Sequence, residues 1–316
     1  MRIHQSLFLA LAIATLHACA PSGPKMVATG QQGMQHLTVD LSYVYWTTSD
    51  GRTSTLYKAL KDDNQPPVQV VAVPGRVEAL AVDDDGLYLV VSGAQGQDVI
   101  RKIPKKKGQP SDLVVSKNKI TSIALDATHV YWTQNGNPGD SDDTMTPGVL
   151  RVMRTGGTPL NLATRQQGIP RQITLSATHV YWVDSEPGKQ NTILGLRKGG
   201  GSVITMAVVP DAETSGVPAL ASDDTSLYYK TRTTIMRLNA DGGVAVKFAT
   251  IPDSDSSILA IDAHNLYFEG PRGPMRFGLA GGPAVPVADG AGPAIAVDSQ
   301  AVYWLTAGSV IQMPKR

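Results

Sequence analysis

Five oxygen-bearing side chains crowd one short segment and are the first candidates for metal chemistry. They are Asn135, Asn137, Asp140, Asp142 and Asp143. Carboxylate and amide oxygens are the ligands that Ca²⁺ prefers, but this spacing is not that of an EF-hand loop. A Ca²⁺ site is therefore one interpretation, a solvated acidic loop is the other, and the identity of any metal stays open.

The sequence gives less support to a histidine-based metal site or to catalysis by a nucleophilic side chain. The chain has six histidines and a single cysteine, Cys19. Of the histidines after that cysteine, His129, His179 and His264 fall in predicted turns and only His36 begins a strand. The sequence holds no Gly-x-Ser-x-Gly, His-Glu-x-x-His or nucleotide-loop pattern. These observations favour a binding protein over an enzyme; a divalent-metal-dependent lyase or hydrolase is the alternative.

A repeat supplies the elements that must position such residues. An Asp, once replaced by Ser, is followed five residues later by Tyr, with Val or Leu before the Tyr. The copies are Asp40/Tyr45, Asp83/Tyr88, Asp126/Tyr131, Ser176/Tyr181, Asp223/Tyr228, Asp262/Tyr267 and Asp298/Tyr303. Starts that advance by 36 to 50 residues are typical of four-stranded propeller blades. The sequence predicts an all-β, single-domain, seven-bladed β-propeller of four-stranded antiparallel blades.

Turn residues divide each repeat into four strands. In the third repeat we expect strands at 120–125, 130–133, 149–154 and 160–164. We expect positive φ at the end of the first turn, because the residues there tolerate it; they are Gly86, His129, His179 and Asn265. Pairs such as Gly156-Gly157 and Gly199-Gly200 fit a hairpin between the last two strands.

Two side-chain patterns fit a ring of blades. Small residues recur at one position of the first strand, where we expect crowding at the axis: Thr38, Ala81, Ala124, Thr174, Ala221, Ala260 and Ala296. The residue after the repeat Tyr is aromatic in every copy except the second, which predicts packing between blades. Those residues are Trp46, Leu89, Trp132, Trp182, Tyr229, Phe268 and Trp304.

The two chain ends predict how the ring closes. The last repeat ends after its third strand, whereas residues 27–33 match the exit of a fourth strand at residues 162–168. We therefore expect the N-terminal strand to complete the last blade, which removes an unpaired edge.

Long loops on one rim, called the top, are the first candidate site. We expect them at residues 134–148, 184–191 and 210–218, because the repeats there exceed the shortest copies. Their candidate binding residues are Asp140, Asp142, Asp143, Asp184, Glu186, Asp211 and Glu213. With Lys189 as the only cation, this sector favours a basic partner surface or a bridging divalent ion.

The mouth of the central channel is the second candidate site, and the alternative enzyme would act there. The starts of the first strands would supply Gln35, His36, Glu78, Thr121, Arg171, Gln172 and Ser257. One acid and one histidine are few for general acid-base catalysis, so no catalytic residue is assigned.

The N-terminus is typical of a targeting segment, with Arg2 followed by an apolar run from Leu7 to Leu16. Leu16-His17-Ala18-Cys19 resembles a bacterial lipobox, which implies cleavage before Cys19 and acylation, including palmitate, of that residue. A secretory signal cut after Ala18 or Ala20 is the alternative. We expect a signal peptide at 1–18, an anchor spacer at 19–25 and the propeller at 26–316. The resemblance implies a lipid-anchored envelope protein, sorted by Ala20 to the outer membrane.

Charge narrows the class of partner. The chain has 28 basic and 27 acidic residues, and cleavage before Cys19 would remove Arg2 alone among them. The mature chain would have no formal net charge, which argues against a nucleic-acid partner. One basic turn could contact anionic headgroups or be a plain hairpin; it holds Arg101, Lys102, Lys105, Lys106 and Lys107. We expect a monomer.

Residues 181–184, Tyr-Trp-Val-Asp, resemble the YWTD repeat of extracellular receptor propellers. Residues 45–47 and 131–133 resemble it more loosely. The wider likeness is to bacterial lipoproteins with degenerate YWTD- or NHL-like propeller repeats. This resemblance implies an envelope protein whose propeller is a binding or scaffold module for a protein or glycan partner.

Overall fold

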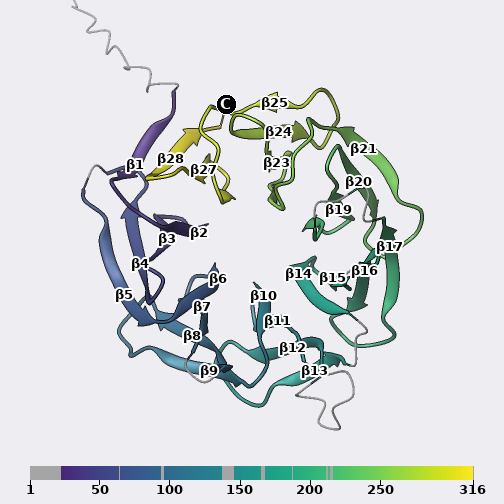
Figure 1. The fold of residues 1–316 in the computed structure, drawn as a ribbon, viewed down its shortest axis with the longest axis horizontal. Coiled ribbons are helices and arrows are strands. Elements are labelled where there is room, and N and C mark those ends of the chain that lie inside the picture. The colour runs from purple at the N-terminus through teal and green to yellow at the C-terminus, as the bar shows by residue number, and fades with distance from the viewer. Residues whose placement is uncertain are drawn as a thin grey trace, which may run out of the picture.

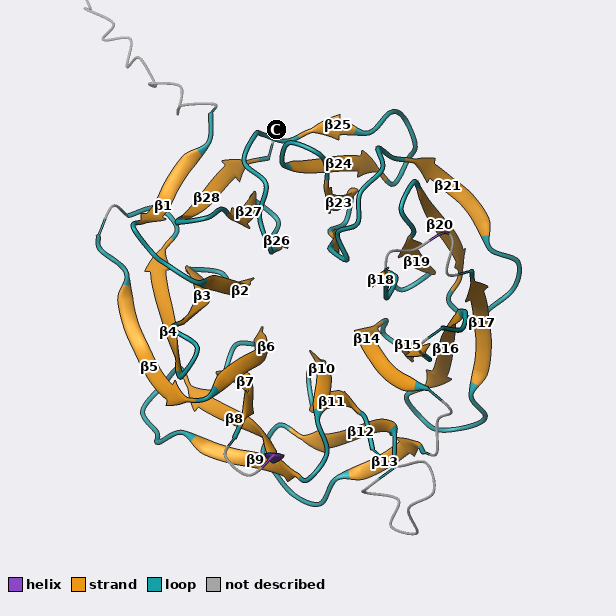
Figure 2. Cartoon of the chain, viewed as in Figure 1, coloured by secondary structure: helices purple, strands orange, loops and turns teal. Residues whose placement is uncertain are grey.

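The computed structural model describes residues 23–63, 65–93, 96–136, 146–164, 168–186, 188–210, 213 and 216–315. Within these residues the strands form seven four-stranded antiparallel sheets. The sheets stand around a central axis as the blades of a propeller (Figure 1). Figure 2 shows a ring built of strands joined by loops. The predicted seven-bladed fold is confirmed.

Each blade runs from the axis outward, and the blades are numbered here in chain order. Blade one comprises β2 (Met34–Val39), β3 (Tyr43–Ser49), β4 (Thr53–Leu60) and β5 (Val68–Pro74). Blade two comprises β6 (Arg76–Val82), β7 (Gly86–Ser92), β8 (Asp98–Pro104) and β9 (Ser111–Ser116). Blade three comprises β10 (Ile120–Leu125), β11 (His129–Gln134), β12 (Gly148–Met153) and β13 (Leu160–Ala163). Blade four comprises β14 (Ile169–Leu175), β15 (His179–Ser185), β16 (Asn191–Arg197) and β17 (Ile204–Val209).

The remaining blades follow the same plan. Blade five comprises β18 (Ala219–Ser222), β19 (Ser226–Lys230), β20 (Thr234–Asn239) and β21 (Val246–Thr250). Blade six comprises β22 (Leu259–Ile261), β23 (Asn265–Glu269), β24 (Pro274–Gly278) and β25 (Val285–Pro286). Blade seven comprises β26 (Ile295–Val297), β27 (Ala301–Leu305), β28 (Ser309–Pro314) and, from the other end of the chain, β1 (Lys25–Thr29).

Ring closure occurs as predicted. β1 pairs antiparallel with β28, with Met26 opposite Ile311 and Thr29 opposite Ser309. Figure 1 shows β1 as the outermost strand beside β28. The N-terminal strand therefore covers an edge that would otherwise present unpaired backbone groups.

The repeated Asp and Tyr act together in the first turn of blades one, three, five, six and seven. In blade three, Asp126 Oδ1 accepts hydrogen bonds from the backbone N-H groups of Thr128 and His129, each at 2.9 Å. Its Oδ2 accepts the Tyr131 hydroxyl at 2.9 Å. The spacing of five residues lets one carboxylate close the turn and hold the ring of the next strand. The repeat is therefore a turn signature.

Packing between blades makes the core. The repeat Tyr of each blade shares a buried cluster with the residue after the Tyr of the next blade: Tyr88 lies with Trp132, and Tyr131 with Trp182. All four tryptophans are buried. On the axis side the small residues lie opposite the tyrosines, as Ala124 does with Tyr131. The predicted interblade role of these aromatics is confirmed.

The expected turn conformations are partly wrong. Gly86, His129, His179 and Asn265 do not have positive φ, because the turn is already closed by the Asp carboxylate or, in blade four, by the Ser176 hydroxyl. The hairpin glycines do: φ is 95° and 127° at Gly156 and Gly157. In blade four the positive-φ pair is Gly200-Gly201, one residue beyond the predicted pair.

Candidate functional site

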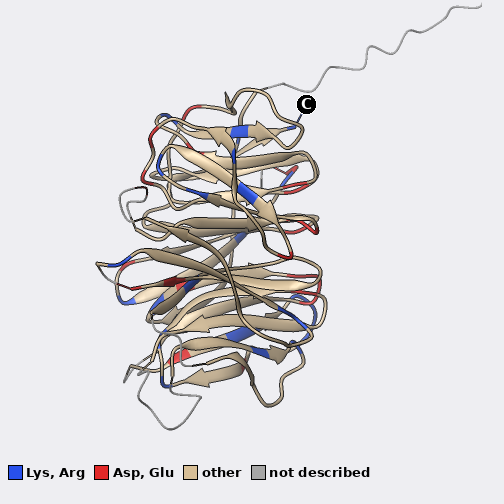
Figure 3. Ribbon diagram, turned by 90° about the vertical axis from the view of Figure 1, so that its right-hand side faces the viewer, with Lys and Arg blue, Asp and Glu red and all other residues tan. Residues whose placement is uncertain are grey.

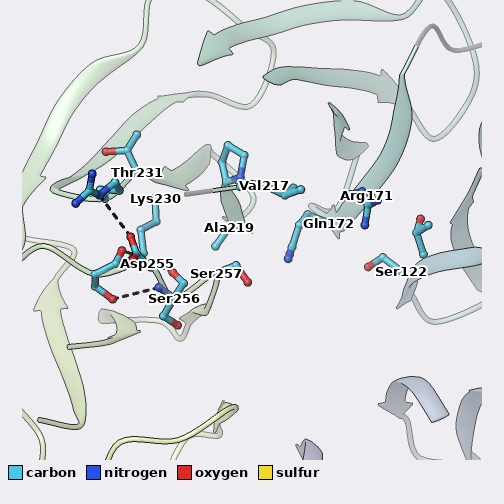
Figure 4. Close-up of a pocket in the computed structure, with 15 residues that line it drawn as sticks. Ser122, Arg171, Gln172, Val217, Ala219, Lys230, Thr231, Asp255, Ser256 and Ser257 are labelled. Atoms are coloured by element: carbon cyan, nitrogen blue, oxygen red, sulfur yellow. Dashed lines mark hydrogen bonds and ion pairs between the residues drawn. The ribbon is translucent and has the colours of Figure 1, made fainter. Parts of the chain in front are cut away.

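A cavity of about 290 Å³ opens at the top of blades three to five. The first strands of these blades form its inner wall, and residues 216–218 and 254–257 flank it. Figure 4 shows side chains from these elements around one opening. The lining residues are Thr121, Ser122, Arg171, Gln172, Gly216, Val217, Pro218, Ala219, Lys230, Thr231, Arg232, Ser254, Asp255, Ser256 and Ser257.

Gln172 has an unusual backbone. Its φ of 51° is the only positive value at a non-glycine residue in the described part of the chain. The pairing register of β14 with β15 shifts between Arg171 and Thr174. Neighbouring side chains on a regular strand point to opposite faces, but this bulge lets Arg171 and Gln172 both line the cavity. Such strain costs about 1–3 kcal/mol and is concentrated at functional sites.

Lys230 is a buried cation at the end of β19. Its residue is 3% exposed, and Nζ donates to the backbone carbonyls of Ser254 at 2.9 Å and Ser256 at 2.8 Å. Burial lowers the pKa of Lys230 to about 8, because the ammonium loses water, while Asp255 and Asp253 act in the opposite direction. The two hydrogen bonds tie the loop before β22 to blade five.

Lys230 was not among the predicted site residues, although its position in the repeat distinguishes it. Two residues after the repeat Tyr, the other blades have Thr47, Val90, Thr133, Val183, Glu269 and Leu305, all buried. A charged residue at this buried position therefore distinguishes its blade from those that have an uncharged residue there. Glu269 is the other case: Oε1 accepts the Gly292 backbone N-H at 3.1 Å, and burial raises its pKa.

The two arginines of the cavity have different surroundings. Arg232 forms a two-pronged ion pair with Asp253, at 3.1 and 2.6 Å, and lies 3.4 Å from Asp255. Arg171 is exposed and makes no hydrogen bond or ion pair with the described residues. Its guanidinium is therefore the cation of this cavity that is available to a ligand.

Four of the seven residues predicted at the channel mouth line this cavity. Thr121, Arg171, Gln172 and Ser257 line it together, whereas Gln35, His36 and Glu78 lie on blades one and two. His36 Nε2 is 2.9 Å from the Val77 carbonyl, and burial lowers its pKa. Burial tends to raise the pKa of Glu78, but Lys119, at 2.9 Å, outweighs this and lowers it. His36 and Glu78 therefore make other contacts, and Gln35 lies on β2, away from the cavity.

The structure describes only three of the seven predicted rim residues, Asp184, Glu186 and Glu213. Asp140, Asp142, Asp143 and Asp211, like Cys19, lie outside the described residues. Glu186 pairs with Lys189 at 2.5 Å, and the Glu213 carbonyl accepts the Arg232 N-H at 2.9 Å.

Asp184 requires a correction, because it belongs to β15 rather than to the loop predicted at 184–191. Its Oδ2 accepts the Gly168 N-H at 3.1 Å. Burial raises the pKa of Asp184, which this hydrogen bond only partly offsets. Its carboxylate therefore joins two segments of blade four.

Three cations of the predicted basic turn make polar contacts within the propeller. Arg101 pairs with Asp112 at 2.6 Å, Lys102 donates to the Arg154 carbonyl at 3.0 Å, and Lys105 pairs with Asp40 at 2.5 Å. Asp40 is in the first turn of the preceding blade. Charged turns of both signs are visible along one edge of the ring in Figure 3.

The described residues contain neither a metal-ligand cluster nor a helix that could span a membrane. No three His, Cys, Asp or Glu side chains there lie close enough to hold a metal ion. In the same residues, no helix has the length and apolar character needed to cross a bilayer.

Fold and site define a seven-bladed β-propeller with a polar cavity at one end of its channel. No family model matches the chain, and no curated protein matches it. Solved structures share the fold. The computationally designed protein Ika8 has a TM-score of 0.57 at 14% identity, with 92% of this chain and 98% of that chain covered.

Two natural structures are similar in fold alone. A puromycin-hydrolysing peptidase of Mycobacterium tuberculosis has a TM-score of 0.62 at 15% identity, covering 91% of this chain and 52% of that one. An extracellular domain assigned to a hybrid two-component system of B. thetaiotaomicron has a TM-score of 0.64 at 11% identity, covering 92% and 39%. The chain thus spans about half or less of these proteins.

Proposed function

We propose that this protein is a lipid-anchored binding module of the bacterial envelope whose top cavity holds a sugar-sized portion of a glycan. The observation that carries the proposal is the cavity, built by three rigid blades and lined by hydroxyls, an amide and cations. At about 290 Å³, its volume lies at the small end of the range for ligand pockets. A concave polar site of this size suits one sugar residue better than a protein surface, which needs a broader contact area.

The lining groups favour binding over catalysis. Among the described lining residues Asp255 is the only carboxylate, and it lies beside the Arg232 guanidinium. Glycoside hydrolysis uses a pair of carboxylates that flank the scissile bond. Hydroxyls and amides instead recognise the hydroxyls of a ligand by hydrogen bonds.

The anchor is part of the proposal and rests on the N-terminal sequence. β1 lies on the outer circumference of the ring (Figure 1), so a spacer at 19–25 would join the ring at its side. Both ends of the channel would remain accessible. Replacing Cys19 with Ser should move the protein from the detergent phase to the aqueous phase; unchanged partitioning would contradict an acyl anchor at this residue.

A glycan array with the detergent-purified full chain tests the binding site. Ser257 is exposed at the cavity, so Ser257→Trp should fill the opening and abolish glycan binding without unfolding the blade. Ala127→Trp is the matched control, because Ala127 is exposed in a turn at the other end of the channel. Binding that survives Ser257→Trp, or capture only of protease-sensitive partners, would overturn the proposal.

A further inference from the structure

We infer that the cavity recognises the carboxylate of an acidic sugar, with Arg171 as the residue that binds it. This inference rests on the proposed glycan-binding function and names the chemical class of the ligand. The carboxylate would meet the Arg171 guanidinium, and the sugar hydroxyls would meet Gln172, Asp255 and Ser257.

Among the described residues at the cavity, one positive charge has no counterion. Three cations, Arg171, Lys230 and Arg232, line it. Two acids, Asp253 and Asp255, lie beside Arg232. A carboxylate carries one negative charge and would balance the site. A phosphate, at nearly two charges, would leave an excess of negative charge next to Asp255.

Arg171 presents the group best suited to a carboxylate. A guanidinium donates two parallel hydrogen bonds to carboxylate oxygens. Arg171 has no such partner within the described chain and is exposed, so its donors need not be released from another contact. The bulge at Gln172 directs it to the cavity.

Lys230 adds positive potential from beneath. Two of its ammonium hydrogens bind the carbonyls of Ser254 and Ser256, and an ammonium has a third donor. A buried cation without a carboxylate in hydrogen-bond contact reduces stability. An anionic ligand would offset that cost.

The remaining wall fits a hydroxylated ligand. Asp255 accepts hydrogen bonds, the Ser257 hydroxyl both donates and accepts, and the Gln172 amide does both. All three line the cavity: Gln172 lies at the bulge of β14, and Asp255 and Ser257 lie in the loop before β22. An acid that carries several hydroxyls, such as a uronic acid residue, would contact both the Arg171 guanidinium and these hydrogen-bonding groups.

Titration calorimetry with the full chain tests the inference. The probes are the methyl glycosides of glucuronic, galacturonic and mannuronic acids, their neutral counterparts, acetate, and glucose 6-phosphate. We expect at least one uronide to bind at least tenfold more tightly than its neutral counterpart. Arg171→Gln should remove this preference. Arg272→Gln, an exposed arginine on the same rim outside the cavity, should leave it intact.

Failures of the two proposals can be told apart. Equal binding of neutral and acidic glycosides, unchanged by Arg171→Gln, would overturn the acidic class and leave glycan binding standing. Tighter binding of glucose 6-phosphate, or of acetate alone, would also overturn it. Absence of binding by every sugar would overturn both. Arg171→Gln should retain the wild-type melting temperature, because Arg171 makes no polar contact with the described residues.

Discussion

Lys198 of blade four forms an ion pair with Asp126 of blade three, with Nζ 3.1 Å from Oδ2. The lysine directly follows β16, and its ammonium lies 5.5 Å from the centre of the Tyr131 ring. One cation thus joins the turn carboxylate and tyrosine of the preceding blade. The ion pair with the turn carboxylate recurs between other neighbours: Lys61 with Asp298, Lys105 with Asp40, Arg154 with Asp83 and Lys315 with Asp262.

Blade four shows what replaces this pair. Ser176 stands where the other turns have Asp, and Ala240 stands where the next blade would supply the cation. The Tyr181 hydroxyl instead donates to the Ala240 carbonyl at 2.8 Å. Both charges are absent together, which avoids an unpaired charge at the junction.

Removal of Lys198 alone should lower the free energy of unfolding more than removal of both Lys198 and Asp126. We predict that Lys198→Ala lowers the free energy of unfolding by about 1–3 kcal/mol, because the partly buried Asp126 loses its cation. The double variant Asp126→Ser with Lys198→Ala should recover much of this loss. Urea denaturation measures both, with exposed Lys106→Ala as the control. Additive losses would show that the two residues are not coupled.

Lys230 should make the protein more stable as the pH rises above about 8. The folded-state pKa is about 8, below the usual 10.5, so between these values the unfolded chain binds one more proton. The free energy of unfolding then rises with pH, by about 3 kcal/mol at most. Lys230→Met should remove this rise and, at pH 7, stabilise the protein by on the order of 1–2 kcal/mol.

The measurement for Lys230 is the difference between wild type and variant in urea melts from pH 7 to 10.5, since other groups titrate equally in both. The charged groups around Lys230 are Asp253, Asp255, Arg232 and Arg171. A difference that does not change with pH would mean that the two carbonyl bonds fully compensate the buried charge.

The backbone strain at Gln172 can be measured directly. Gln172→Gly keeps the bulge and accepts positive φ, whereas Gln172→Ala loses the same amide but retains the strain. We predict that the glycine variant is more stable than the alanine variant by about 1 kcal/mol in thermal denaturation. Equal stabilities would indicate that the loop relaxes in both variants.

Deletion of residues 26–30 should weaken the whole ring. β28 would lose its pairing with β1 and expose backbone donors and acceptors in blade seven. We expect a lower melting temperature together with concentration-dependent association by light scattering. Met26→Gln is the control, because Met26 is 63% exposed and keeps its backbone pairing. A monomer that melts at the wild-type temperature would contradict the closure role.

The sequence alone determined the ring. Asp and Tyr five residues apart describe a local turn, and each copy imposes the same register on its blade, so counting copies gave seven blades. The chain ends predicted the closing strand for the same reason, since the match between residues 27–33 and 162–168 is local. The residue after each Tyr, aromatic in six of the seven copies, was placed between blades because a buried position that recurs in every repeat contacts the same position of the neighbouring repeat.

Only the tertiary structure decided the site. Thr121, Arg171, Gln172 and Ser257 were all predicted at the channel mouth, but the sequence does not say which strand starts converge across blades. Lys230 was missed because its role depends on the carbonyls of Ser254 and Ser256, 24 and 26 residues later. The bulge at Gln172 and the position of Asp184 in a strand likewise follow from pairing with neighbouring strands. Repeats are set by local chemistry, whereas the cavity forms where non-repeating residues of different blades meet.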